Sequence, residues 1–226
     1  MAVILGFDVY GTLIDVSGII NVLEKHVGKD APKFSKLWRE KQLEYSFRRS
    51  AMQNYQAFSV CTRHALEYAC LAFQYELSDE AKEELLAAYA QLPAFPEVVE
   101  SLEQLQKENF RLFAFSNGQA EAVQNLLKNA GLLHYFEAVI SVDEVKSFKP
   151  NPAVYGHFLR QTDALGHEAW LVSSNPFDVL GAMSAGMQAA WVKRSEKVIF
   201  DPWGIEPHLI VSQLTDLYSA LTSSVT

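Results

Sequence analysis

Five short apolar runs are spaced along the chain, and polar residues follow most of them. The runs cover residues 3–7, 112–115, 138–140, 169–172 and 189–192. Continuous apolar runs of this length are typical of strands buried on both faces of a parallel sheet. Apolar residues at helical spacing lie between the later runs, at 98–105, 123–127, 154–159 and 179–183. This alternation predicts an α/β fold built on a doubly wound, Rossmann-like parallel sheet.

The stretch from residue 16 to residue 92 has a different pattern. Its apolar residues, for example Ile19, Leu23 and Val27 or the later Leu37 and Leu43, recur at helical intervals and show no strand alternation. We therefore predict two domains, a core of residues 1–15 and 93–226 and an all-helical cap of residues 16–92 inserted after the first strand. A cap at this point is well placed to cover a site at the carboxyl ends of the strands.

Polar side chains stand at the ends of the predicted strands. They are Asp8, then Ser116-Asn117-Gly118, then the stretch 143–149, and then Ser173-Ser174-Asn175. Because the carboxyl ends of parallel strands meet at one edge of a sheet, we expect the chemistry there. Each feature alone has a common structural explanation, since an Asp after a strand often caps a turn and a Lys-Pro pair is usually a solvated loop.

Composition and charge narrow the class of protein and its partners. The 226 residues are 49% hydrophobic and 20% charged, which is typical of a globular chain. The net charge is −8 and the 19 Lys and Arg residues are scattered, so we expect no nucleic-acid partner. The first apolar run is too short for a signal peptide or a membrane span, which predicts a cytoplasmic protein. Cys61 and Cys70 fit neither a zinc site nor a redox pair and are expected to be buried free thiols.

Four motifs resemble, in order, those of the haloacid dehalogenase superfamily. They are residues 8–13 (Asp-Val-Tyr-Gly-Thr-Leu), residues 116–118, Lys149-Pro150 and residues 173–178. In that superfamily the first Asp is a nucleophile that forms a covalent aspartyl intermediate. Most members transfer phosphoryl groups and carry a second Asp two residues later, as the acid for the leaving oxygen, beside a Mg²⁺ site. Here Tyr10 stands at that position and residues 173–175 lack an acidic residue, which implies a site without a metal.

The predicted cap adds a more specific resemblance. Residues 37–45, Leu-Trp-Arg-Glu-Lys-Gln-Leu-Glu-Tyr, closely resemble the LWRxKQLEY segment of L-2-haloacid dehalogenases. In that family the arginine receives the departing halide, which implies this role for Arg39, with Asn117, Phe58 and Phe177 as co-donors. A halide needs no acid to leave, and a monoanionic haloacid needs no divalent counter-ion. Tyr10 and the missing acidic residue therefore agree with dehalogenation.

The resemblance also implies roles in the first half-reaction. Asp8 would attack C2 of the substrate, while Thr12 and Lys149 orient its carboxylate and keep it ionised. Arg39 and Asn117 would contact the substrate through its halogen. The carboxylate of the substrate would be bound by Ser116 and by the backbone N–H groups of Val9 and Tyr10.

In the second half-reaction implied by the resemblance, water attacks the aspartyl ester. Asp178 would position and activate this water, together with Lys149, Ser173 and Asn175. Tyr155 is expected to orient Asp178 or Lys149. Its helical spacing from Phe158 and Leu159 equally allows a position that serves only the packing of the core.

These observations predict a hydrolytic dehalogenase, without a cofactor or metal, that converts short (S)-2-haloacids to (R)-2-hydroxyacids and halide. Haloacetates, fluoroacetate included, are further candidate substrates. The alternatives are a Mg²⁺-dependent phosphatase acting on a small phosphate ester and a non-catalytic binding protein on the same scaffold. Phe177 replaces a tryptophan of many relatives, so the halogen preference stays open. Such relatives are commonly dimers, which implies a homodimer.

Overall fold

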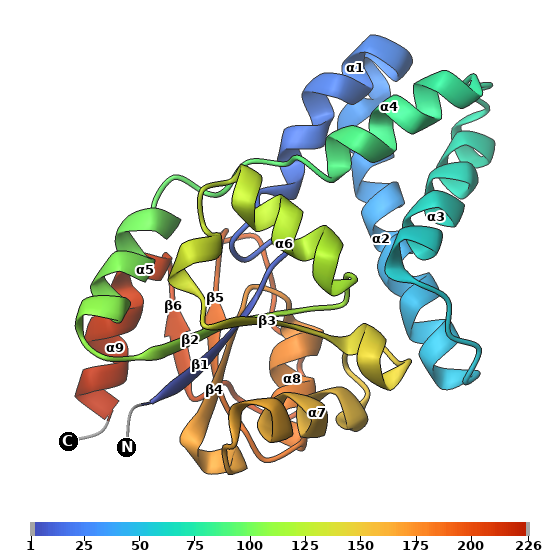
Figure 1. Cartoon of the computed structure of the whole chain (residues 1–226). Helices are drawn as coiled ribbons and strands as arrows, with labels where there is room; N and C mark the ends of the chain where they lie inside the picture. The colour runs from blue at the N-terminus through green and yellow to red at the C-terminus, as the bar shows by residue number, and fades with distance from the viewer. Residues whose placement is uncertain (1–2, 225–226) are drawn as a thin grey trace.

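The computed structural model describes residues 3–224 and contains a six-stranded parallel sheet between two layers of helices (Figure 1). The strand order is β3-β2-β1-β4-β5-β6. The strands are β1 (Ile4–Asp8), β2 (Arg111–Ser116), β3 (Ala138–Ser141), β4 (Ala169–Ser173), β5 (Gln188–Val192) and β6 (Leu209–Val211). The predicted doubly wound sheet is confirmed, and each of the five apolar runs forms a strand. β6 was not predicted, because it is a three-residue edge strand whose Ile210 is 56% exposed.

Helices cover both faces of the sheet. One face carries α5 (Val98–Lys107), α6 (Ala120–Asn129) and α9 (Leu217–Ser224), and the other carries α7 (Pro152–Thr162) and α8 (Pro176–Ser184). Their apolar residues belong to two separate buried clusters, with Leu102 and Val123 in one and Val154 and Val179 in the other. Every residue of β1 is buried between these clusters, as a central strand of a doubly wound sheet requires.

Residues 16–92 form four main helices and no strand. They are α1 (Ile20–Val27), α2 (Ala31–Ala51), α3 (Phe58–Phe73) and α4 (Asp79–Tyr89), and they stand apart from the sheet layers in Figure 1. In α2 the apolar pattern pointed to Leu37 and Leu43, but both are only half-buried. The buried face instead includes Trp38 and the polar Gln42, whose amide is satisfied by hydrogen bonds within the helices.

The two connections between these helices and the sheet run side by side. The N–H of Asp15 donates to the carbonyl of Pro93 at 2.8 Å, and the N–H of Phe95 donates to Leu13 at 3.0 Å. Between them, Ile14 forms an antiparallel bridge with Ala94. We propose this two-stranded junction as the boundary between a core of residues 1–15 and 93–226 and a cap of residues 16–92.

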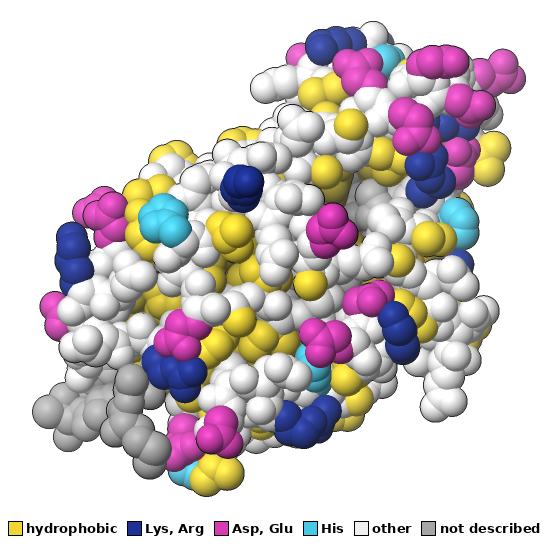
Figure 2. Space-filling model, viewed as in Figure 1, with side chains coloured by type: hydrophobic (Ala, Val, Ile, Leu, Met, Phe, Trp, Pro, Cys, Tyr) yellow, Lys and Arg dark blue, Asp and Glu magenta, His cyan; other side chains and the backbone are white. Residues whose placement is uncertain are grey.

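The surface and the cysteines agree with the sequence pattern. On the face shown in Figure 2, Lys and Arg side chains lie singly among Asp and Glu, without a broad basic patch. No helix within residues 3–224 has the length and apolar character needed to cross a membrane. Cys61 and Cys70 are buried and free, as predicted.

Candidate active site

The register of the sheet brings polar side chains together beyond its carboxyl edge. Asp8 at the end of β1 pairs with Phe115 in β2, and Phe7 pairs with Val172 in β4. The next residue along each neighbouring strand is a serine that ends it. β4 therefore ends level with β1, with Ser173 beside Asp8, and β2 ends one residue further, in Ser116.

The carboxylate of Asp8 is held in one orientation by four side chains. Its Oδ2 accepts hydrogen bonds from Asn175 Nδ2 at 2.7 Å, Thr12 Oγ1 at 3.0 Å and Ser173 Oγ at 3.2 Å. Its Oδ1 accepts from Lys149 Nζ at 3.2 Å. Asp8 is 8% exposed, so these contacts lie in a largely water-free environment where they act strongly.

Lys149 lies between two buried carboxylates. Its Nζ donates to Asp178 Oδ2 at 2.8 Å and to the carbonyl of Phe115 at 2.8 Å, in addition to Asp8. Burial raises the pKa of Asp178 to about 6, while Lys149 opposes the shift and the charge of Asp8 adds to it. One ammonium thus serves two carboxylates, which leaves Asp178 ready to exchange a proton near neutral pH.

Tyr155 is fully buried and also bonds to Asp178. Its hydroxyl donates to Asp178 Oδ1 at 2.7 Å. Burial and the neighbouring Asp178 raise the pKa of Tyr155 well above its usual value, so it remains a donor. The side chain of Tyr155 therefore packs in the core and also holds Asp178 through a hydrogen bond.

Ser116 and Asn117 follow β2 and are both buried. The Oγ of Ser116 accepts from the N–H of Gly118 at 3.1 Å and keeps its hydroxyl proton for another partner. The Oδ1 of Asn117 accepts from the N–H of Lys149 at 2.9 Å, so its Nδ2 is free to donate elsewhere. After β1, the carbonyl of Val9 accepts from Leu13 at 3.0 Å, which closes the turn that begins at Asp8.

The helices of residues 16–92 bring Arg39 and Phe58 to the same edge. Arg39 on α2 donates from Nη1 to Gln42 Oε1 at 2.6 Å and from Nη2 to the carbonyl of Tyr10 at 3.4 Å. The ring of Phe58, at the start of α3, lies 6.1 Å from the ring of Tyr10. Glu40 faces solvent, with its side chain 58% exposed, so it does not approach the site.

Phe177 is half-buried at the start of α8, where it contacts α2. Its ring makes an edge contact with Phe47 at 4.9 Å. The four residues with an expected halide role therefore come from two parts of the chain. Arg39 and Phe58 belong to the helices of residues 16–92, whereas Asn117 and Phe177 follow strands of the sheet.

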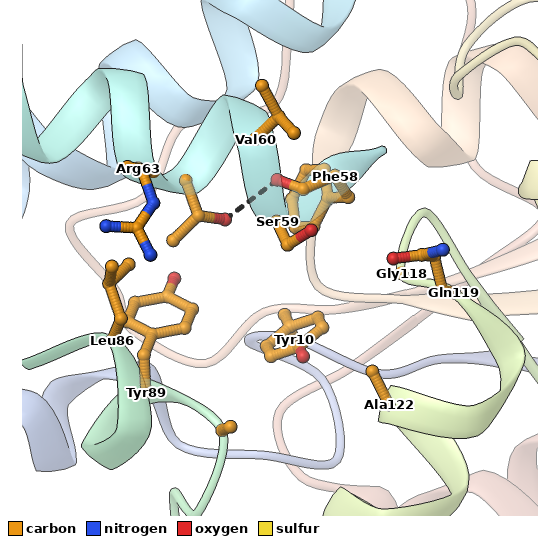
Figure 3. A pocket seen from close by; sticks show the side chains of 12 residues that line it. Tyr10, Phe58, Ser59, Val60, Arg63, Leu86, Tyr89, Gly118, Gln119 and Ala122 are labelled. Carbon is orange, nitrogen blue, oxygen red and sulfur yellow. Dashed lines mark hydrogen bonds between the residues drawn. The ribbon is translucent and has the colours of Figure 1, made fainter. Parts of the chain in front are cut away.

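A pocket of about 240 Å³ opens between α3, α4 and the start of α6 (Figure 3). Tyr10, Phe58 and Tyr89 line it together with Gln119. The ring of Tyr10 stacks on Tyr89 at 5.9 Å. Tyr10 also belongs to the turn after Asp8, so the pocket lies beside this turn, although Asp8 itself does not line it.

Contacts at the far end of α2 fasten the helices to the loop before Lys149. The hydroxyl of Tyr55 donates to Asp143 Oδ1 at 2.6 Å, and the ring of Tyr55 stacks on Phe148 at 4.9 Å. Ser50 and Ser147 share a hydrogen bond of 2.9 Å. The structure thus shows the helices closed over the sheet edge.

Three groups at the site had no predicted role. The N–H of Ser174 donates to Thr12 Oγ1 at 2.9 Å, and its hydroxyl holds the turn at Gly11. The Phe115 carbonyl is a backbone group and carries no sequence signal. Gln42 stands three residues after Arg39, a helical spacing that places both on one face and could have identified it. Across residues 3–224, no three His, Cys, Asp or Glu side chains are grouped as metal ligands.

The chain is similar to known proteins over most of its length. The model of the haloacid dehalogenase-like hydrolase family matches residues 4–192. The (S)-2-haloacid dehalogenase 2 of Pseudomonas sp. (strain CBS-3) is 35% identical over 215 residues, which cover 95% of this chain and 93% of that protein. The haloacetate dehalogenase H-2 of Moraxella sp. (strain B) is 36% identical over 215 residues, 92% of each.

A solved structure shows the same arrangement of strands and helices. The L-2-haloacid dehalogenase from Xanthobacter autotrophicus, with chloropropionic acid covalently bound, has a TM-score of 0.93 and 30% sequence identity. The match covers 98% of this chain and 99% of that one. The likeness therefore includes the helices of residues 16–92 as well as the sheet.

Proposed function

Because this chain belongs to the haloacid dehalogenase-like hydrolase family, we propose that it hydrolyses the carbon–halogen bond of short (S)-2-haloacids. The products are an (R)-2-hydroxyacid and a halide ion. The observation that carries this proposal is the carboxylate of Asp8, fixed by four side chains, with Arg39 reaching the adjacent turn from α2. The likeness to a haloacetate dehalogenase supports haloacetates as further substrates.

In the first step, Asp8 Oδ1 attacks C2 of the substrate and the carbon–halogen bond breaks. We assign the attack to Oδ1, because Oδ2 is already held by three donors whereas Oδ1 accepts one from Lys149. The halide leaves with the bonding electron pair toward Arg39, and C2 inverts. The positive guanidinium stabilises the charge that develops on the halogen. The other groups proposed to hold the substrate are Ser116, Asn117, Phe58, Phe177 and the N–H groups of Val9 and Tyr10.

In the second step, water attacks the ester carbonyl of Asp8 and gives a proton to Asp178. The carbonyl oxygen is then Oδ2, and its donors Thr12, Ser173 and Asn175 stabilise the oxyanion of the tetrahedral intermediate. This intermediate expels the hydroxyacid, whose alkoxide takes up the proton. The hydroxyacid keeps an oxygen of Asp8, and Asp8 gains one from water, so the configuration of C2 does not change again.

A phosphatase reaction fits this donor set poorly. Its leaving oxygen needs an acid at the position of Tyr10, but burial and the neighbouring Tyr89 raise the pKa of the Tyr10 hydroxyl well above its usual value. A divalent cation needs carboxylate lone pairs, but Asp8 Oδ2 is surrounded by three donors and Lys149 places a positive charge beside Oδ1. The site is therefore arranged for a substrate whose leaving group needs neither acid nor metal.

Hydrolysis of the ester should slow once the pH falls below the pKa that Asp178 has in the ester form, because a protonated Asp178 cannot accept a proton from water. This pKa lies below about 6, since Asp8 is uncharged in the ester and no longer raises it. Steady-state halide release should fall roughly tenfold per pH unit below this value, while the first turnover continues. Mass spectrometry of acid-quenched protein should show the ester accumulating on Asp8 at low pH. Accumulation at high pH instead would contradict the role of Asp178.

The function is tested by halide release from the separate enantiomers of 2-chloropropionate, in buffer with EDTA. We expect release from the (S)-enantiomer alone and formation of (R)-lactate. Chloroacetate and fluoroacetate, measured alongside, rank the halogens. Phosphatase activity on p-nitrophenyl phosphate that appears with Mg²⁺, without halide release in EDTA, would show that the dehalogenase proposal is wrong.

We also propose that the protein is a homodimer that associates through the outer side of α2 and α3. Met52, Tyr68 and Leu71 are 63%, 39% and 79% exposed there, beside a groove of about 490 Å³. Apolar side chains gathered in this way favour contact with a second copy. Light scattering coupled to gel filtration should give twice the mass of the chain, and Leu71→Glu should shift it toward the monomer. The cytoplasmic location stays a prediction.

A further inference from the structure

A buried glutamine on α2, Gln42, connects Arg39 to side chains on α3 and α4. Gln42 is fully buried on α2, one turn after Arg39. Its Oε1 accepts from Arg39 Nη1 at 2.6 Å and from the hydroxyl of Tyr89, at the end of α4, at 3.2 Å. Its Nε2 donates to Thr62 Oγ1, on α3, at 2.6 Å. Helices α2, α3 and α4 therefore meet at a single amide.

The direction of this amide is determined by its neighbours. The hydroxyl of Thr62 donates to the carbonyl of Phe58 at 2.9 Å, the bond drawn in Figure 3. The Thr62 oxygen must then accept, so the NH₂ group of Gln42 faces Thr62 and the amide oxygen faces Arg39. Reversing the amide would leave buried polar groups unpaired, which is costly. The oxygen beside the guanidinium is thus held in place from α3.

Gln42 and the carbonyl of Tyr10 hold Arg39 through two different nitrogens. Because the guanidinium is planar, bonds at Nη1 and Nη2 fix its plane, and its remaining N–H groups keep a set direction. Both partners are neutral oxygens. The side chain therefore keeps a full positive charge that no carboxylate in these contacts offsets.

We propose that Gln42 is a positioning residue for dehalogenation, which orients Arg39 toward the departing halide while leaving its charge available. Thr62 and Tyr89 act through Gln42. This inference rests on the proposed function and deepens it. The benefit lies in preorganisation, because a donor already aimed at the developing charge does not have to reorient during the reaction.

The test uses Gln42→Glu, which keeps the shape of the side chain and places a negative charge next to the guanidinium of Arg39. The rate of the first turnover of halide is measured per active site with (S)-2-chloropropionate and (S)-2-bromopropionate. Chloride is the poorer leaving group and depends more on Arg39. We expect the chloride rate to fall about ten- to hundredfold and the bromide-to-chloride rate ratio to rise about tenfold. A fraction of misfolded protein does not change this ratio.

Two further variants complete the experiment. Thr62→Val removes the acceptor that orients the amide but leaves Gln42 and Arg39 in place, so the rate ratio should rise in the same direction. Glu40→Gln also changes the charge next to Arg39 by one unit, but it does so on the exposed face of α2. It should leave both rates unchanged.

Equal losses with both halides in Gln42→Glu, or none, would overturn the positioning role. Arg39→Met separates this result from failure of the proposed function. If that variant releases chloride at the normal rate, the halide role of Arg39 is itself wrong. If it loses the activity while Gln42→Glu keeps a normal rate ratio, only the inference about Gln42 fails.

Discussion

Asp8→Asn should abolish halide release from every haloacid. The amide oxygen is a far weaker nucleophile than the carboxylate, so the first-turnover rate should fall by a factor of about 10⁴ or more. The fold should survive, because asparagine has the same shape and its oxygen still accepts from donors around Oδ2. Chloride release in a stopped-flow assay measures the rate, and circular dichroism checks the fold.

Isotope labelling tests the identity of the nucleophile. In one turnover of the wild-type protein in water enriched in heavy oxygen, the label should enter Asp8 and not the hydroxyacid. The label in the product of the first turnover would instead show direct attack by water on C2. As a control for Asp8→Asn, the same substitution at Asp79, on the exposed surface of α4, should keep the wild-type rate of halide release.

Lys149→Met should cost both activity and stability. Methionine fills much of the same volume but leaves Asp8 and Asp178 buried without their shared cation. Breaking a buried ion pair in this way destabilises a protein by about 3–5 kcal/mol at neutral pH. Without the ammonium, the attacking Oδ1 of Asp8 loses its donor, and turnover should fall below detection. Urea unfolding monitored by fluorescence measures the loss in free energy of unfolding.

The dependence on pH distinguishes this cause from a packing defect. Burial already raises the pKa of Asp178, and loss of Lys149 should raise it further. A carboxyl whose pKa is higher in the folded than in the unfolded state binds its proton more tightly when folded. The variant should therefore be more stable at about pH 5 than at about pH 8 relative to the wild type. Lys36→Met, an exposed control, should change stability by less than about 1 kcal/mol at either pH. A constant deficit across this range would point to packing alone.

The strands of the core were predictable because their signal is local. A run such as residues 112–115 is apolar throughout, and a strand buried on both faces needs no other information. β6 was missed for the same reason, since its exposed Ile210 and three-residue length leave little local pattern. In α2 the apolar residues indicated a helix, but its buried face runs through Gln42, which is polar.

The residues of the candidate site were likewise only partly predictable from the sequence. Asp8 and Lys149 were identified from motifs, and the structure places them 3.2 Å apart across 141 residues of sequence. The partners of Gln42 were not identified, because Thr62 and Tyr89 are ordinary helix residues that only packing brings to it. No motif marks a hydrogen bond between distant helices.

The residues alone were enough to indicate the α/β class, the helical insertion and the family, because hydrophobic period and motif order are properties of the linear chain. Three-dimensional packing decided which oxygen of Asp8 is held by three donors, how one ammonium is shared by two carboxylates, and what orients Arg39. These features depend on distances between segments far apart in the chain. They also depend on burial, which sets the strength of every charge and hydrogen bond at the site.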